Sequence, residues 1–440
     1  ITASISQLDG KKIEKFSFKN KDEINKAISS IKEKKFSIKD ISSKIINRNP
    51  SGPFTTSTLQ QTAWSRLGFG ASRTMQIAQK LYQGIEIEGE TIGLITYMRT
   101  DGTNLSKDAI STFRDYIKKE MGNEYLPENA MNYSGKKAKN AQEAHEAIRP
   151  TDIIRTPQSV KKYLSVDQNK LYDLIWSRAL SSQMESAKFD RNTITISSDN
   201  NDTICKASGS VLKFDGFLKI YNNPNKDEDE SILPAMNKGL VNIEALLDEQ
   251  HFTQPPPRYS EASLVKKLEE LGIGRPSTYA SIISTIANRG YAEILNKRFF
   301  PTDRGKLISA FLEKLFSKYV DYNFTAGLED QLDEITSGKE SWIKVLELFW
   351  KDFHNNVSEV KEKRTREVLD LLNDSLGDLV FDKDDNGNIV RKCQLCSSGT
   401  LSLKNSFRGG AFIGCSNYPE CKFTRPLSKA KAAAQAQLAE

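Results

Sequence analysis

The sequence predicts a mixed α+β protein of several domains, and three observations carry this prediction. Its 440 residues are enough for about three domains of ordinary size. Two blocks with apolar residues at helical spacing flank residues 191–221, where Ile and Thr alternate as in an antiparallel sheet. Four of the five cysteines lie together near the C-terminal end, which indicates a separate small module.

The composition excludes two classes of protein. No apolar run reaches the roughly 18–20 residues that a membrane helix needs, so we expect no membrane span. Five cysteines in 440 residues exclude a secreted scaffold held by disulfides. Lys and Arg number 63 against 57 for Asp and Glu, and a net charge of +6 does not by itself identify nucleic acid as a partner. The start at Ile1, without Met or a signal-peptide pattern, suggests a piece of a longer protein.

The N-terminal half predicts helices around a short strand. A polar, Lys-rich segment contains a helix that begins at Asp22 and ends near Ile31, and the Pro and Gly residues of 49–53 break regular structure. Residues 55–82 have apolar positions at helical spacing and predict a helix, and the apolar run 92–97 predicts a strand. Another helix is expected after Ser106, a suitable N-cap.

The region after residue 257 predicts a winged helix-turn-helix. Ser260 caps a helix that Gly272 and Gly274 end, and a second helix is expected to begin at Pro276-Ser277. A small hairpin over 291–302 follows, which completes the order of helix, turn, helix and basic hairpin. Residues 258–310 carry 9 Lys and Arg against 5 Asp and Glu, which favours a DNA-facing surface. The alternative is an ordinary helical hairpin with solvated charges.

The cysteine cluster predicts a structural metal site. The spacing Cys393-x2-Cys396, followed by Cys415 and Cys421, is typical of a tetrahedral zinc ribbon, and four thiolates leave no open position for a substrate. The alternative is four unrelated buried thiols. Basic residues with interleaved rings surround the cysteines, a combination that suits single-stranded DNA, although so small a module also needs rings for its own core. These rings are Phe407, Phe412, Tyr418 and Phe423.

Tyr97 is a candidate nucleophile. A free phenol has a pKa of about 10 and needs a nearby cation or base to react at neutral pH. In an extended segment Arg99 would point to the same side as Tyr97 and could hold a phosphate bidentately. Because Tyr-x-Arg is short and common, a buried Tyr beside a surface Arg is the alternative on chemistry alone. His145 is one of three histidines, and a lone His is more often a structural group than a catalyst.

Several motifs resemble the type IA DNA topoisomerases, in order and over nearly the whole chain. Residues 93–101 resemble the family's nucleophile motif, and the four-cysteine ribbon that begins at Cys393 is similar to those that end bacterial members. On these motifs the chain is identified as a member of the bacterial branch. The other matching stretches are 53–60, 144–151, 272–279 and 324–329.

The resemblance implies roles for the matching positions. Tyr97 would attack a DNA phosphodiester and form a 5′-phosphotyrosyl bond, which releases a free 3′-OH. Arg99 would orient the scissile phosphate, and His145 would support the site. The second winged-helix-like helix would present free N–H groups to a bound strand. The positions implied to contact DNA are Arg99, Arg149, Arg275, Ser277, Thr278 and Tyr279.

The resemblance also implies a domain organisation and an activity. The expected protein relaxes negatively supercoiled DNA without ATP, by transient breakage of one strand and passage of another. The alternative is a non-catalytic module that binds single-stranded DNA. Further expectations are a monomer, a place at the nucleoid in the cytoplasm, and RNA polymerase as a candidate partner of the C-terminal region. The implied domains are 1–57, the first half of a β-rich gate or arch; 58–184, with Tyr97; 185–257, the second half of the arch; 258–370, a helical DNA-binding domain; and 371–440, the zinc ribbon and a tail.

The chain departs from the family pattern in three ways. The usual Asp-Ser-Thr after the nucleophile motif is Asp101-Gly102-Thr103, and a single four-cysteine ribbon is present where relatives often have several. No counterpart of the N-terminal TOPRIM domain is visible, whose Asp-x-Asp cluster holds the catalytic Mg²⁺. The acidic runs 227–230 and 382–385 are interpreted as solvated loops. We therefore expect structural Zn²⁺ in the ribbon, catalytic Mg²⁺ held outside this chain, and an inactive fragment.

Overall fold

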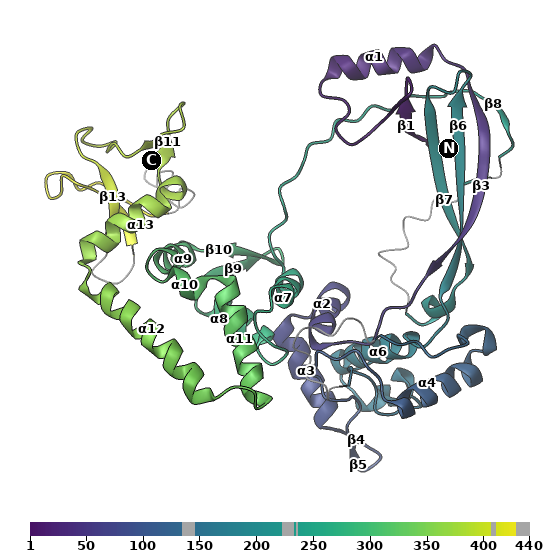
Figure 1. Ribbon diagram of the computed structural model, residues 1–440, viewed down its shortest axis with the longest axis horizontal. Coiled ribbons are helices and arrows are strands. Elements are labelled where there is room, and N and C mark those ends of the chain that lie inside the picture. Colours follow the sequence, from purple (N-terminus) through teal and green to yellow (C-terminus); the bar gives the residue numbers. More distant parts are fainter. Residues whose placement is uncertain (134–145, 222–232, 235, 406–410, 428–440) are drawn as a thin grey trace.

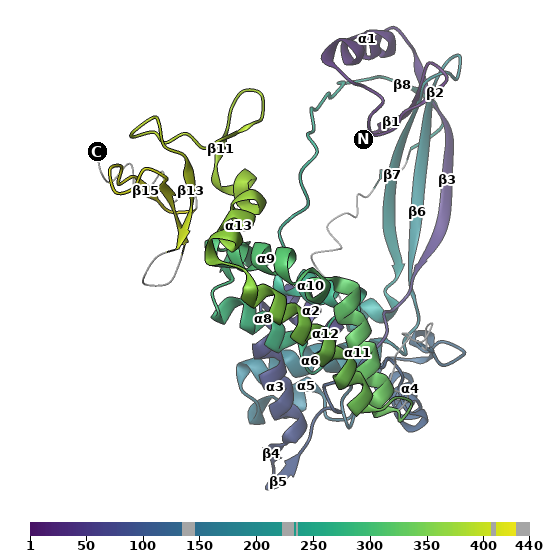
Figure 2. The same cartoon turned by 60° about the vertical axis from the view of Figure 1, so that its left-hand side comes forward.

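The computed structural model describes residues 1–133, 146–221, 233–234, 236–405 and 411–427. The prediction of a mixed α+β chain is confirmed. Long strands rise from one helical domain, and an extended segment, residues 242–260, returns from their far end to a second helical domain (Figures 1 and 2). The C-terminal module lies beyond that second domain. No helix among the described residues has the length and apolar character to cross a bilayer.

The arch is a six-stranded antiparallel sheet in the order β2-β1-β7-β6-β3-β8. Its long strands are paired over most of their length, with Ile38 opposite Ile196 and Ile194 opposite Ala207. These apolar side chains form a small core at the apex, against which part of helix α1 packs. The elements are β1 Ser4–Leu8, β2 Lys11–Lys12, α1 Lys21–Lys32, β3 Phe36–Arg48, β6 Ala187–Ser198, β7 Ile204–Phe214 and β8 Gly239–Val241.

Lys34 links several turns at the apex of the arch. Its Nζ donates hydrogen bonds to Oδ1 of Asp202 (2.9 Å) and Oγ1 of Thr203 (2.8 Å) in the β6–β7 turn, and it also pairs with Asp9 in the β1–β2 turn. The hydrogen bond from Lys34 holds the pKa of the Asp202 carboxyl well below its usual range. Three turns far apart in the sequence are thereby joined at one ammonium group.

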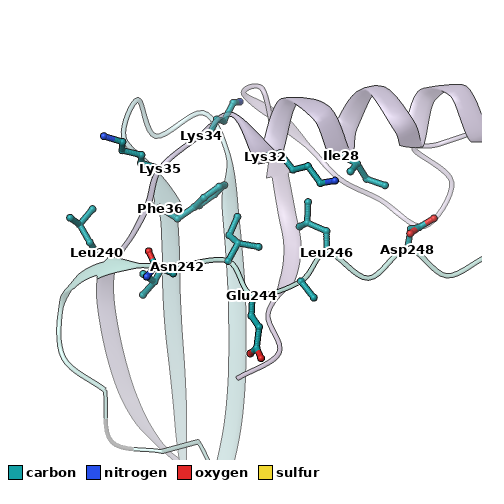
Figure 3. Close-up of a pocket in the computed structure, with 13 residues that line it drawn as sticks. Ile28, Lys32, Lys34, Lys35, Phe36, Leu240, Asn242, Glu244, Leu246 and Asp248 are labelled. Atoms are coloured by element: carbon teal, nitrogen blue, oxygen red, sulfur yellow. The ribbon is translucent and has the colours of Figure 1, made fainter.

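A pocket of about 940 Å³ lies beside this apex, between α1, β3 and the segment that follows β8 (Figure 3). Phe36 lies at its apolar wall. Its charged lining carries both signs, with lysines from the end of α1 and the start of β3 and carboxylates from the descending segment. These charged residues are Lys32, Lys34, Lys35, Glu244 and Asp248.

The domain with Tyr97 corrects one sequence prediction. Residues 55–82 form two helices instead of one, because Gly68 adopts a left-handed conformation (φ +70°) and its N–H caps the first helix by donating to Trp64 and Ala63. A large core fills this domain, in which Leu59, Leu81 and Ile175 are fully buried. The elements are α2 Thr56–Leu67, α3 Ala71–Gln83, β4 Ile85–Ile87, β5 Glu90–Ile92, α4 Lys107–Glu120, α5 Pro157–Val160 and α6 Val166–Ser181.

The second helical domain has the predicted order of two helices and a hairpin. Its second helix begins at Tyr279 and not at Pro276, because residues 275–278 form a turn in which Thr278 N–H donates to the Arg275 carbonyl (2.8 Å). The elements are α7 Glu261–Glu270, α8 Tyr279–Asn288, β9 Ala292–Leu295, β10 Arg298–Pro301, α9 Asp303–Leu315, α10 Ser317–Val320, α11 Tyr322–Thr336 and α12 Trp342–Glu362.

The C-terminal module shares its core with a helix. Leu372 and Leu376 of α13 are buried with Leu401 and Ile413 of the small sheet, so the helix and the sheet form one packed unit. Oδ1 of Asn373 accepts the N–H of Leu403 (2.8 Å), which fixes their register. The elements are α13 Thr365–Val380, β11 Asp382–Lys383, β12 Ile389–Val390, β13 Leu401–Asn405, β14 Ala411–Cys415 and β15 Thr424–Arg425.

Candidate functional site

The segment that carries Tyr97 is an ordered loop, so the prediction of a strand over 92–97 is wrong. Strand β5 ends at Ile92, and the following residues form a single antiparallel β-bridge, between Ile95 and Pro150, instead of a continuous strand. Leu94 N–H donates to the Leu81 carbonyl at the end of α3 (2.8 Å), and Thr96 N–H donates to the Arg149 carbonyl (2.9 Å). The apolar character of this run therefore reflects burial of the loop between α3 and residues 147–151.

Helix α2 supports the loop from its other side. Oγ1 of Thr56, in the first turn of α2, donates to the Met98 carbonyl (2.7 Å) and accepts the N–H of Thr100 (2.8 Å). The backbone N–H of Thr56 donates in turn to the Thr100 carbonyl (2.8 Å). The two residues on either side of Arg99 are therefore fixed by a helix N-terminus.

Tyr97 and Arg99 both lie on the outer side of the loop. Buried Met98 and Thr100 alternate with them, and 40% of Tyr97 is exposed, so the alternative of a buried tyrosine does not hold. Neither the Tyr97 hydroxyl nor the Arg99 guanidinium makes a hydrogen bond or ion pair with any residue that the structure describes. Both groups are available to a ligand.

The segment after His145 is placed against this loop, whereas His145 itself lies outside the described residues. Arg149 is largely buried, and its guanidinium donates to Oε2 of Glu146 (2.8 Å) and to the Pro150 carbonyl (3.0 Å). Oε1 of Glu146 accepts the N–H of Ser106 (2.8 Å) at the start of α4. Arg149 thus differs from Arg99, because its donors already have partners within the chain.

The predicted DNA contacts at the start of α8 are unequal in exposure. Arg275 donates to Oδ2 of Asp333 (2.8 Å) and Oδ1 of Asp330 (3.3 Å), both on α11. Burial opposes the charged form, but these carboxylates outweigh it and raise the pKa of Arg275. Tyr279 is 6% exposed in a core with Val265, and burial raises its pKa to about 12.

Of the remaining two positions, Ser277 is exposed, and Oγ1 of Thr278 accepts the N–H of Arg275 (2.8 Å). The structure therefore leaves Ser277 open to a ligand and uses Thr278 to close the turn.

Two glutamates of α7 join this domain to the domain with Tyr97, and sequence reasoning missed both. Oε2 of Glu261 accepts the N–H of Ala71 at the start of α3 (2.7 Å), where the N-cap residue Gly70 has no side chain to do so. Oε2 of Glu269 accepts the hydroxyl of Ser57 in the first turn of α2 (2.7 Å). A helix that begins after glycine was the one available signal, but it does not say which carboxylate supplies the cap.

The four predicted cysteine ligands converge on one point. Their Sγ atoms all lie within 4.8 Å of one another, with Cys393 and Cys421 3.8 Å apart and Cys396 and Cys415 3.6 Å apart. Zinc–sulfur bonds of about 2.3 Å in a tetrahedron require sulfur–sulfur distances of about 3.8 Å, so the donor set fits zinc. Backbone N–H groups lower the pKa of the Cys396 thiol, whereas at Cys421 a backbone hydrogen bond is outweighed by burial and the neighbouring thiols, which raise the pKa of that thiol. Without a cation the four sulfurs therefore do not all ionise together.

The five residues between Cys415 and Cys421 form a turn, in which Cys421 N–H donates to the Asn417 carbonyl (2.8 Å) and brings the two thiols to the same site. Of the four rings near the cysteines, Tyr418 is 72% exposed and Phe423 packs against the core of the module. Phe407 lies outside the described residues.

Comparison with known proteins defines the class to which these features belong. Residues 1–347 match the family model described as DNA topoisomerase, and residues 390–430 match that of the topoisomerase DNA-binding C4 zinc finger. The first match covers well over half of the chain, so the chain belongs to the DNA topoisomerase family. Its relatives and its structural match place it more narrowly in the bacterial topoisomerase I group of type IA.

The similar proteins are longer than this chain. It is 47% identical to DNA topoisomerase 1 of Rickettsia prowazekii over 430 residues, which are 97% of this chain and 55% of that protein. It is 45% identical to DNA topoisomerase 1 of Zymomonas mobilis, covering 96% of this chain and 34% of that protein. Full-length topoisomerase I from Thermotoga maritima matches with a TM-score of 0.75 at 32% identity, covering 98% of this chain and 64% of that structure. The chain thus spans about half the length of the Rickettsia relative.

Proposed function

We propose that this chain supplies the nucleophile and part of the DNA path of a type IA topoisomerase, which relaxes negatively supercoiled DNA without ATP. The observation that carries the proposal is the pair formed by Tyr97 and Arg99 on the outer side of a firmly held loop, both free of partners among the described residues. The family membership supports the same activity.

In the proposed reaction the phenolic oxygen of Tyr97 attacks a phosphodiester of single-stranded DNA. The phenol gives up its proton, a bond forms between its oxygen and phosphorus, and the bond from phosphorus to the 3′ oxygen breaks. The 3′ oxygen takes up a proton and leaves as a hydroxyl, so the proton lost by the phenol and the proton gained by the 3′ oxygen balance. Arg99 binds the non-bridging oxygens of the same phosphate and stabilises the charge that develops on them. Because the phosphotyrosine conserves the bond energy, resealing by the 3′-OH needs no ATP.

We propose that magnesium is held by groups outside the described part of this chain. Within residues 1–133, 146–221, 233–234, 236–405 and 411–427, the four cysteines are the one group of three or more potential metal ligands. The acidic run 382–385 forms an exposed turn, in which Asp384 caps Asn386 and Asn388, and the run 227–230 lies outside the described residues. The described residues offer no cluster of three or more carboxylates placed to hold a metal ion, which supports the proposal that groups outside them hold Mg²⁺ and complete the active site.

The proposed partner of both helical domains and of the ribbon is DNA, with zinc holding the ribbon in shape. Four thiolates fill the coordination sphere, so the metal acts on structure and not on the reacting phosphate. A monomeric state, contact of the C-terminal region with RNA polymerase and a place at the nucleoid in the cytoplasm stay predictions of the family resemblance.

The test is covalent trapping on a labelled single-stranded oligonucleotide under denaturing conditions. We expect no adduct with the 440-residue chain alone. An adduct should form when the chain is completed with the N-terminal part of the Rickettsia prowazekii relative, and Tyr97→Phe should abolish it, because phenylalanine has no oxygen to attack with.

Two outcomes contradict the proposal. An adduct formed by the chain alone would show that the site is complete within it. An adduct formed by the completed Tyr97→Phe variant would show that another residue is the nucleophile. If the chain proves to be a non-catalytic module, it will bind single strands, with an affinity that falls steeply with salt, and give no adduct in either form.

A further inference from the structure

The side chain of Tyr97 has an aromatic neighbour that no sequence motif indicated. Tyr82 lies at the end of α3, and its ring meets the ring of Tyr97 edge to face, with centroids 5.3 Å apart and planes at 65°. Both residues are 40% exposed. The contact therefore contributes little to the domain core, although it lies directly beside the proposed nucleophile.

The backbone fixes the distance between these two rings. The Leu94 N–H bonds to the Leu81 carbonyl, one residue before Tyr82. A Cβ atom at Gly93 would lie 2.7 Å from the carbonyl oxygen of Tyr82, so the loop can pass under the end of α3 only because residue 93 is glycine. Helix α3 is itself held by Leu81 and Ala78, both fully buried. The Tyr82 ring thus stands on a rigid support at a set distance from Tyr97.

An unrestrained nucleophile would be a poor one. The Tyr97 hydroxyl has no hydrogen bond to a described residue, so no described group at its polar end selects one rotamer. In-line attack requires the oxygen to lie about 3–3.5 Å from phosphorus in one direction. An edge-to-face neighbour on a rigid helix restricts the χ1 and χ2 angles of the phenol before DNA binds.

We infer that Tyr82 is a positioning residue for Tyr97, whose ring holds the nucleophilic phenol in the orientation used for attack. This inference rests on the proposed function. It depends on the ring of Tyr82 and not on its hydroxyl, because the contact is between ring edge and ring face. Phenylalanine should therefore replace Tyr82, whereas leucine should not.

The test compares Tyr82→Leu and Tyr82→Phe in the completed enzyme, by single-turnover adduct formation at saturating oligonucleotide. Tyr82→Leu should slow adduct formation about three- to tenfold, the effect of losing one aromatic pair, with an unchanged Kd for DNA. Tyr82→Phe should stay within about twofold of the parent rate. The matched control is Tyr116→Leu, which removes another edge-to-face pair of the same domain, with Trp176 at 5.8 Å, and should leave the rate unchanged.

A parent-like rate for Tyr82→Leu at saturating oligonucleotide would overturn the inference. If the Kd rises while that rate stays parent-like, Tyr82 is a DNA-stacking residue instead. A measurement on the 440-residue chain separates this failure from failure of the proposed function. With 3-fluorotyrosine at position 97, Tyr82→Leu should shift and sharpen the ¹⁹F resonance, whereas Tyr116→Leu should not. An unchanged resonance in Tyr82→Leu would refute the contact whether or not the completed enzyme cuts DNA.

Discussion

The cysteine cluster brings four Sγ atoms within 4.8 Å of one another, whereas the Tyr97 loop leaves its phenol and the Arg99 guanidinium without a polar partner among the described residues. Both regions are held to the rest of their domains by hydrogen bonds, so the difference does not lie in how they are anchored. The two regions differ in the direction in which their polar side chains point. The ribbon turns its reactive groups toward one another, and the loop satisfies its backbone while directing its side chains outward. The first arrangement suits a site completed by a single ion, and the second suits a site completed by a large substrate and by other protein groups.

The largest effect is expected from breaking the complete site. Cys393→Ser should reduce zinc from about one ion per chain to almost none and unfold the small sheet, because a structural zinc site supplies the folding free energy of such a module. Zinc content by elemental analysis and proteolysis after residue 380 measure this. The control is Cys205→Ser on β7. This variant should retain the zinc content of the parent protein. A zinc content in Cys393→Ser equal to that of the parent would show that Cys393 is not needed to bind zinc, and it would contradict the description of the ribbon as a site completed by a single ion.

Arg99→Ala tests the open site. In the completed enzyme it should lower the rate of cleavage by about 10²–10³, the usual cost of losing one contact to transition-state charge, while the Kd for DNA changes little. Arg155→Ala is the matched control, since Arg155 lies in the same domain and already pairs with Asp152. A loss confined to the Kd, with a parent-like cleavage rate at saturating DNA, would mean that Arg99 binds DNA without a preference for the transition state.

Glu261→Ala tests how firmly the domain with Tyr97 is held by its neighbour. Removing an N-cap costs about 0.5–2 kcal/mol, so hydrogen exchange at the Ala71 amide should become about two- to thirtyfold faster. Glu270→Ala, on the same helix but paired only with Lys266 and Lys267, should leave this amide unchanged. An unchanged rate in Glu261→Ala would show that apolar packing alone closes the interface.

The smallest effect is expected from acid at the apex of the arch. The pKa of Asp202 is lowered in the folded state, so its ion pair with Lys34 contributes stability above the unfolded pKa of about 3.9. This contribution is lost as the pH falls below that value toward the folded pKa. Hydrogen exchange of the β6–β7 turn, expressed relative to the intrinsic exchange rate of the unfolded chain at each pH, should therefore be steady from pH 7 to about pH 4 and rise below it.

The same measurement on variants assigns this acid response. Asp202→Asn should show faster exchange throughout and lack the rise below about pH 4, whereas Asp199→Asn, an exposed neighbour in the same turn, should retain it. A rise that persists in Asp202→Asn would assign the response to another carboxyl group, of which Asp9 is the nearest by contact with Lys34.

The spacing of residues in the sequence was enough to predict the features that are formed by residues close together in the chain. The Ser106 cap, the hairpin after α8 and the cysteine ligands were all predicted, because caps, turns and paired thiols involve residues close in sequence. The strand predicted over 92–97 was wrong because its apolar residues reflect burial against α3 and residues 147–151.

Contacts between distant segments could not be predicted. Arg275 was expected to face DNA, but its carboxylate partners lie more than 50 residues away on α11, where the sequence shows only an acidic helix. The cap that Glu261 supplies to α3 and the ring that Tyr82 presents to Tyr97 also arise from packing, which no local period encodes.

The Glu261 cap and the contact between Tyr82 and Tyr97 lie at opposite ends of helix α3. Glu261 of α7 holds its first N–H, and the Tyr97 loop is joined to its last turn. Its 13 residues span about 20 Å, so a tilt of about 10° about the Glu261 end would move Tyr97 by roughly 3.5 Å. That displacement equals the whole distance across which a nucleophile attacks phosphorus. In the proposed reaction, a separation of the two domains that tilts helix α3 by this amount would therefore be enough to withdraw Tyr97 from the phosphate.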